Sequence, residues 1–249
     1  MYFNWAFPFD VVKTNRILNT NFSKECGENL PREMAALYER GQFRNGVFRG
    51  LVCNLGIAAV NNMFGAWTFD TTGVLLVAAT TATQPLNVLM TLRQEINVNA
   101  MKEPSYRQLI QQNLPRLFTL GYTAALARNF FVMTAFLPKT LGNDWLMLDA
   151  GFSFGALLVS HPFEVARVLI VGRERERMMG STVQTLQRVF ANEGIAGLYK
   201  GFVPRTLHLF PVLLSLATIH PAGANQATIG GMRINPLLGS LKLSPLKED

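Results

Sequence analysis

Two segments of the chain carry a proline, an acid two residues later and a base five residues later. They read Pro8-Phe9-Asp10-Val11-Val12-Lys13 and Pro162-Phe163-Glu164-Val165-Ala166-Arg167. Proline inside a helix kinks it, and opposite charges at this helical spacing can form ion pairs. The chemistry indicated by these residues is charge pairing at helix kinks.

The sequence contains few residues that could form a catalytic site. The chain contains three histidines and two cysteines, and it offers no pair of acids at catalytic spacing from which a site could be built. Two cysteines, Cys26 and Cys53, are too few for a disulfide framework. We therefore expect no enzyme and no metal centre.

A third copy of the proline pattern lies midway between the first two. Pro85 stands 77 residues from Pro8 and 77 residues from Pro162, but Asn87 and Met90 replace the acid and the base. A fixed period of this kind indicates equivalent structural units. The units expected within a single domain, residues 1–220, are repeats at 1–67, 68–141 and 142–220.

The composition favours a membrane protein. Hydrophobic residues make up 49% of the chain and charged residues 16%, whereas about 25% of residues are charged in typical soluble proteins. The uncharged stretches 51–69 and 71–92 approach the roughly 20 residues that span a bilayer. The net charge of +7 is explained by an excess of Lys and Arg on one side of a membrane, so no nucleic-acid partner is expected.

Each repeat is predicted to contain two long helices joined by a short amphipathic helix. The predicted helices are 1–18, 30–40 and 47–67, then 71–95, 105–112 and 117–138, then 144–173, 181–192 and 202–220. Ser181 and Gln184 form a possible capping box at the start of the last short helix. We therefore predict an all-α membrane protein of six tilted transmembrane helices in three pseudo-repeats.

The polar connections within the repeats hold most of the basic residues, which places all three connections on one side of the membrane. These residues are Lys24, Arg32, Arg40, Arg44 and Arg49 in the first connection, Lys102, Arg107 and Arg116 in the second, and Arg173, Arg175, Arg177, Arg188 and Lys200 in the third.

The chain resembles the mitochondrial carrier family, most closely in its last third. That third reads His161-Pro162-Phe163-Glu164-Val165-Ala166-Arg167 and then Asn192-Glu193-Gly194-Ile195-Ala196-Gly197-Leu198-Tyr199-Lys200-Gly201-Phe202. The end of the second block returns as Phe48-Arg49-Gly50 in the first third and as Phe118-Thr119-Leu120-Gly121 in the second. The resemblance implies six helices around a pseudo-threefold axis in the mitochondrial inner membrane, with the short helices on the matrix side.

The resemblance also implies a matrix-side gate, in which the acid of each repeat pairs with the base of the next. Substrate binding offsets the breaking of this ring and so permits alternating access. Glu164 and Lys13 are the one complete pair here, and Gln94 matches the glutamine that braces the ring.

The other two pairs of the implied gate are eroded. Arg167 would face Asn87, and Asp10 would face Met90. The outer gate is not evident either, because 61–66, 135–139 and 218–221 contain no aromatic residue followed by an acid and a base. Seven residues precede Pro8, about 10 Å of helix, so the first helix is expected to lack its outer half and to leave a slot.

Candidate substrate contacts follow from the resemblance. Ile57, Arg128 and His208 lie seven residues after the glycines of the three short motifs, and Arg128-Asn129 resembles the pair found in carriers of amino acids and carboxylates. The planar guanidinium suits a carboxylate. Alternatively, Arg128 is a relic or pairs with an acid or a lipid phosphate, and His208 is a hydrogen-bonded packing residue.

Bound cardiolipin is the one lipid ligand that the resemblance implies, and no cofactor is expected. Gly50 and Gly201 precede helices whose free N–H groups favour phosphate, and Arg49 and Lys200 add positive charge beside them.

The tail, residues 221–249, has no helical or strand periodicity and is expected to be irregular and bound to a partner. The first hypothesis is therefore a carrier-fold accessory subunit of a larger complex of the respiratory or ATP synthase type, docked through its N-terminal half-helix and tail. The alternatives are an active transporter of small carboxylates or amino acids, and an outer-membrane carrier homologue in protein insertion.

Overall fold

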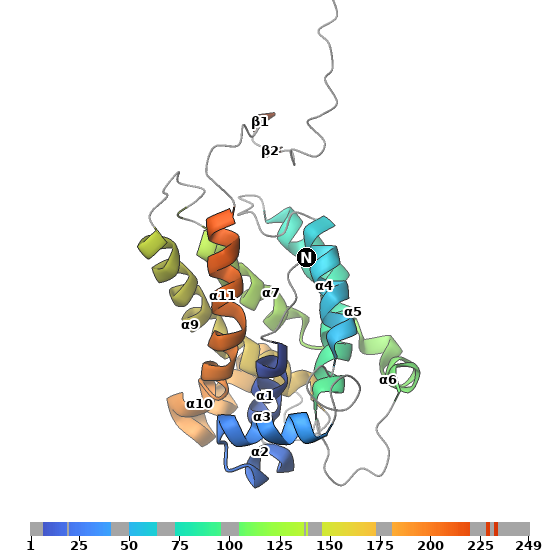
Figure 1. The fold of residues 1–249 in the computed structure, drawn as a ribbon. Coiled ribbons are helices and arrows are strands. Elements are labelled where there is room, and N and C mark those ends of the chain that lie inside the picture. Colours follow the sequence, from blue (N-terminus) through green and yellow to red (C-terminus); the bar gives the residue numbers. More distant parts are fainter. Residues whose placement is uncertain are drawn as a thin grey trace, which may run out of the picture.

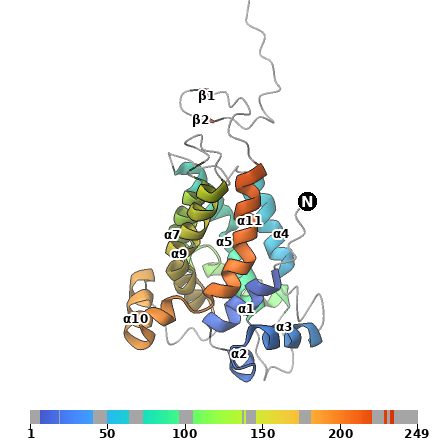
Figure 2. The ribbon, with the colours of Figure 1, turned by 60° about the vertical axis from the view of Figure 1, so that its left-hand side comes forward.

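The computed structural model describes most of the chain, and the helices stand as an upright bundle with short helices at one end (Figures 1 and 2). The described residues are 7–18, 20–40, 50–63, 73–95, 105–136, 138, 146–172, 181–219, 228–229 and 232–233.

The upright helices follow one another around the bundle. They are α1 (Phe7–Ile17), α4 (Leu51–Met63), α5 (Val74–Gln94), α7 (Tyr122–Met133), α9 (Leu146–Val171) and α11 (Phe202–Ile219). From α4 through α5, α7 and α9 to α11 each helix packs against the next, and α11 returns to α1. Helices α1, α5 and α9, which carry the kink prolines, also contact one another. These three helices therefore converge on the axis of the bundle.

Short helices gather at the end where α1 lies (Figure 1). They are α2 (Asn21–Glu25), α3 (Leu30–Glu39), α6 (Tyr106–Asn113) and α10 (Thr182–Leu198), with the 3₁₀ turn η1 (Leu114–Arg116) after α6. A second 3₁₀ turn, η2 (Thr134–Phe136), continues the far end of α7. The predicted capping box of Ser181 and Gln184 is confirmed, and Ser105 with Gln108 forms a second one at α6. Helix α2 was not predicted, and α10 runs beyond its predicted end through a break at Gly194.

An ion pair fixes α3 beneath α1. The Arg16 guanidinium donates to Glu33 Oε2 through Nε at 2.9 Å and Nη2 at 2.7 Å, and Ser23 Oγ donates to Glu33 Oε1 at 2.7 Å. Phe22 and Leu37 pack into the main apolar cluster at the same place. The short helices thus close this end of the bundle.

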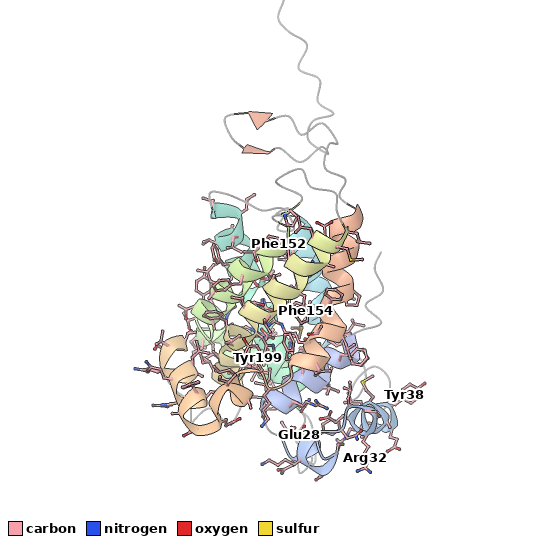
Figure 3. All side chains as sticks on the ribbon, turned by 90° about the vertical axis from the view of Figure 1, so that its left-hand side faces the viewer. Glu28, Arg32, Tyr38, Phe152, Phe154 and Tyr199 are labelled. Carbon is pink, nitrogen blue, oxygen red and sulfur yellow. The ribbon has the colours of Figure 1, made fainter. Side chains whose placement is uncertain are left out.

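The upright helices bury many polar side chains beside the apolar clusters and expose large apolar side chains on the outside. Met147 is 82% exposed, and other large apolar side chains on the upright helices, including Leu55, Phe154 and Leu207, are exposed as well. Figure 3 shows Phe152 and Phe154 on the upright part of α9, Arg32 and Tyr38 on α3 at one end, and Glu28 in the turn between α2 and α3. An apolar surface around buried polar groups is the arrangement that lipid favours.

Two helices of the described chain, α5 and α9, are long and apolar enough to cross a membrane by length and composition. Helices α1, α4 and α7 have 11, 13 and 12 described residues, and residues 1–6, 64–72 and 139–145 beside them lie outside the described part. The prediction that the first helix lacks its outer half concerns residues 1–6 and so lies outside the described residues.

Three glycines with left-handed backbone lie directly against the converging helices. They are Gly50 (φ 87°), Gly121 (φ 67°) and Gly201 (φ 77°). An added Cβ would lie 3.4 Å from Met90 and Gln94 at Gly50, 3.3–3.4 Å from Val171 and Arg167 at Gly121, and 3.1–3.3 Å from Lys13 and Ile17 at Gly201. Each pair of neighbours stands five and nine residues after a kink proline, so the three contacts are equivalent.

The spacing Gly151-x-x-x-Gly155 predicts close packing of this helix against a neighbour. In the structure, however, an added Cβ at either glycine would meet no atom within 4 Å.

The described part of the tail is an antiparallel pair of two-residue strands, β1 (Thr228–Ile229) and β2 (Met232–Arg233), so the tail is not wholly irregular. The rest of 221–249 lies outside the described residues.

Candidate functional site

Glu164 lies at the centre of a buried cluster of charges where α1, α7 and α9 meet. Its Oε1 accepts from Lys13 Nζ at 2.7 Å and from Arg167 Nη2 at 2.9 Å. Its Oε2 accepts from Arg167 Nε at 2.9 Å and from Arg128 Nη1 at 3.0 Å. The residue is 1% exposed, so three cations replace the water that an ionised carboxylate would otherwise hold.

Asp10 forms the second acidic point of the cluster. It accepts from Lys13 Nζ at 2.5 Å and from Gln94 Nε2 at 2.6 Å. Thr14 Oγ1 donates to Gln94 Oε1 at 2.7 Å, which fixes the amide orientation. Lys13 therefore joins both carboxylates, and the Gln94 amide reaches Asp10 where the resemblance implied a base at position 90.

The joint between α5 and α9 is also bridged without an ion pair. Arg167 Nη1 donates to Thr91 Oγ1 at 2.9 Å and to the Asn87 carbonyl at 3.5 Å. The Asn87 amide instead donates to the Thr83 carbonyl of its own helix at 3.1 Å, and Met90 lies in the apolar cluster. The two joints where the family pattern would place ion pairs, and where the sequence has Asn87 and Met90, are instead occupied by hydrogen bonds among the described residues.

Helix α5 contributes a stripe of uncharged polar side chains to this interior. All of them are buried, and they follow the spacing of one helical face: Thr80, Gln84, Asn87, Thr91 and Gln94. Sequence reasoning identified Asn87 and Gln94 and missed Thr91. The three-and-four spacing of the stripe was the signal that could have found it.

Arg128 belongs to the same cluster. Its Nε and Nη2 donate to Asn129 Oδ1 at 3.0 and 2.7 Å, and Asn129 Nδ2 donates to Thr80 Oγ1 at 3.0 Å. The Arg128 side chain retains 16% of its exposure. Of the alternatives raised by the sequence, pairing with an acid describes this arginine, and its partner is Glu164.

The other two candidate contacts stand on different helices. Ile57 of α4 is partly buried and packs against the main apolar cluster. His208 of α11 is buried, and its ring lies edge-on to Phe7 with 6.3 Å between the ring centroids. The hydrogen bonds thus join Arg128 and Asn129 to the charge cluster, whereas Ile57 is held by apolar packing.

Arg205 is a buried arginine that sequence reasoning missed. It is 1% exposed, and its Nη2 donates to Ser160 Oγ at 2.8 Å. Its Nη1 lies 3.2 Å from His161 Nδ1 and 3.5 Å from the Leu157 carbonyl. Within the described residues it has no carboxylate partner, and an arginine on an apolar helix was the available signal.

The expected lipid positions have other contacts in the structure. Lys200 Nζ lies 3.8 Å from Glu28 Oε1 and 3.9 Å from Glu193 Oε2. Gly50 and Gly201 have the left-handed backbone and close packing described above, which by themselves require glycine. Arg49 lies outside the described residues.

Metal-ligating side chains do not gather in the described part of the chain, where no group of three or more His, Cys, Asp or Glu residues could hold an ion.

Comparison with known proteins finds a family model that matches the last third of the chain. Residues 148–218, which contain Glu164, Arg167 and Arg205, match the family model described as mitochondrial carrier protein. The match supports a member of the mitochondrial carrier family. No curated protein matches the chain significantly. Members of this family are transporters and not enzymes, and the family implies a mitochondrial membrane.

Proposed function

We propose that this chain is a three-repeat, six-helix carrier of the mitochondrial inner membrane that serves as an accessory subunit of a larger membrane complex. Its charge cluster around Glu164 then holds this end of the bundle closed permanently, instead of opening and closing as a gate. We call this cluster the lock. The observation that carries the proposal is Glu164, which accepts four hydrogen bonds from Lys13, Arg128 and Arg167.

The three-repeat arrangement is supported by the equivalent glycine contacts. Gly50, Gly121 and Gly201 each pack against a neighbouring helix that carries a repeat proline. In every case the residues they contact stand five and nine positions after that proline. Helix α4 therefore leans on α5, α7 on α9, and α11 on α1. This cyclic order is what three equivalent repeats around one axis would produce.

The lock follows from the energetics of the joints. Opening this end would require the Glu164 carboxylate to leave Lys13 of α1 and Arg128 of α7, while Arg167 of its own helix stays beside it. A buried charge that loses partners is costly. Helix α5 supplies only neutral groups to its two joints, so it provides no charged partner to stabilise an open arrangement. A static structural role fits these contacts better than repeated opening does.

The experiment for the accessory role is purification of the complex in mild detergent. We expect the chain to migrate with a larger assembly on native gels and to cross-link to its other subunits, with residues 221–249 among the contact sites. Recovery of the chain as a free monomer, with full stability, would contradict the proposal. Liposomes that contain the purified chain should exchange no small carboxylates or amino acids.

A transporter is the second candidate, favoured by the partial exposure of Arg128. A carboxylate that bound this guanidinium would compete with Glu164 and remove one cation from the lock. Substrate exchange in liposomes that is abolished by Arg128→Ala, but retained by replacement of the exposed Arg116 with Ala, would establish transport and exclude the accessory role. Fractionation of mitochondria separates both from an outer-membrane role.

We also propose that cardiolipin binds beside Gly50 with Arg49, and beside Gly201 with Lys200. Because Lys200 lies near two carboxylates, its contribution requires the phosphate to displace them. Lipid extracted from the purified protein and identified by mass spectrometry tests the proposal, and Lys200→Gln should reduce the amount bound.

A further inference from the structure

The residue before the kink proline forms the same hydrogen bond in two of the helices. Gln84, before Pro85, donates from Nε2 to the Leu120 carbonyl at 2.5 Å. His161, before Pro162, lies with Nε2 3.1 Å from the Lys200 carbonyl. Each carbonyl belongs to the residue before the glycine that directly precedes α7 or α11. The two bonds are therefore equivalent, although the donors are an amide and an imidazole.

Arg205 sets the tautomer of His161. A carbonyl can only accept, so Nε2 carries the proton that faces Lys200. Arg205 Nη1 donates to the other ring nitrogen, Nδ1, at 3.2 Å, and that nitrogen must then be an acceptor. The ring is further held by stacking on Tyr199, with 5.8 Å between the centroids.

We propose that Gln84 and His161 are clamps that join each kinked helix to the start of the next helix in its own repeat. Helices α5 and α7 then move as one rigid pair, and α9 and α11 as another. Any change of shape occurs between the pairs, at the joints bridged by Thr91, Lys13 and Gln94 and at the joint between α7 and α9, which Arg128 and Glu164 bridge. The proposal holds whether the chain transports a substrate or acts as a subunit.

The chain itself supplies matched replacements. Phe7 stands before Pro8, at the equivalent position of the first repeat. His161→Phe therefore keeps an aromatic ring and removes both hydrogen bonds, whereas His161→Gln installs the amide that serves in the second repeat. Gln84→Leu is the corresponding loss on α5.

Spin labels measure the rigidity of the pairs directly. In protein with Cys26 and Cys53 replaced, labels at the exposed Leu158 and Leu207 report on α9 and α11, and labels at Val77 and Leu158 report across two pairs. We expect a narrower distance distribution within the pair than across pairs. His161→Phe should widen the first distribution at least about two-fold, while His161→Gln leaves it narrow.

Several outcomes would overturn the clamp. They are equal widths within and across pairs in the unsubstituted protein, a narrow distribution in His161→Phe, or an equal widening by His161→Phe and His161→Gln. If His161→Phe does not fold, Gln84→Leu with labels at Val77 and Phe130 provides the same test on α5 and α7. Failure of both to fold leaves the comparison of widths in the unsubstituted protein, which decides by itself.

Discussion

Glu164 gives the sharpest prediction at the level of single residues. Glu164→Gln removes the buried charge that Lys13, Arg128 and Arg167 share, and loss of one partner from a buried charge pair costs about 3–5 kcal/mol. For a chain of this size the melting temperature should fall by about 2–4 °C for each kcal/mol lost. Thermal unfolding in detergent measures the fall, and Glu193→Gln, at an exposed acid, is the control. Equal melting temperatures would contradict the lock.

Thr91 gives a second prediction at this level. Thr91→Val keeps the shape of the side chain but leaves Arg167 Nη1 without its nearest acceptor on α5. A hydrogen bond to a charged group contributes about 1.5–3 kcal/mol, so the variant should unfold at a lower temperature. The control is Thr81→Val, because Thr81 is exposed and its hydroxyl bonds to Val77 and Tyr122 instead. Equal losses in the two variants would show that the α5–α9 joint has no special role.

At the level of helices, the glycines separate backbone strain from packing. Gly201 and Gly73 both have left-handed backbone, with φ of 77° and 69°. An added Cβ would meet the Lys13 carbonyl at 3.1 Å in the first case and nothing within 4 Å in the second. Gly73→Ala should therefore cost only the strain, about 1–2 kcal/mol.

Gly201→Ala should cost clearly more than Gly73→Ala, because α11 must also move away from α1. The melting temperatures of the two variants measure the difference. A loss at Gly201 no larger than that at Gly73 would mean that the contact between α11 and α1 yields freely.

Helix boundaries illustrate what the pattern of residues could and could not predict. The uncharged stretch around Pro85 predicted α5 within three residues at each end, and Pro162 marked α9 equally well. Helix α2 was missed because five residues, Asn21–Glu25, carry no periodic signal. Its N-cap is Thr20, whose hydroxyl accepts from the Ser23 amide. This hydrogen bond depends on the backbone conformation at the turn, so residue type alone did not indicate it.

At the level of the whole molecule, the orientation in the membrane can be tested with Cys26. This residue lies beside α2 on the end with the short helices, outside the spanning segments. Partial burial and the carboxylates of Glu33 and Glu25 raise the pKa of its thiol. The reactive thiolate therefore forms only as the pH rises above the usual range for cysteine, and labelling by a maleimide should accelerate with rising pH.

A membrane-impermeant maleimide should label Cys26 in inside-out inner-membrane vesicles and not in intact mitoplasts, provided that the basic end faces the matrix. Cys53, buried on α4, should stay unlabelled in both, and a Cys26→Ser variant gives the background. Labelling in intact mitoplasts would reverse the proposed orientation.

The sequence by itself determined the repeated proline pattern, the long helices that contain Pro85 and Pro162, and the absence of charge at positions 87 and 90. Those features depend on residue type and spacing, which the chain carries without folding. It could not determine what takes the place of the missing charges. Hydrogen bonds reach only about 3 Å, so only tertiary packing could bring Gln94 to Asp10, Thr91 to Arg167 and Arg128 to Glu164. The structure thus converts a ring that reads as broken along the chain into one that is bridged at every joint.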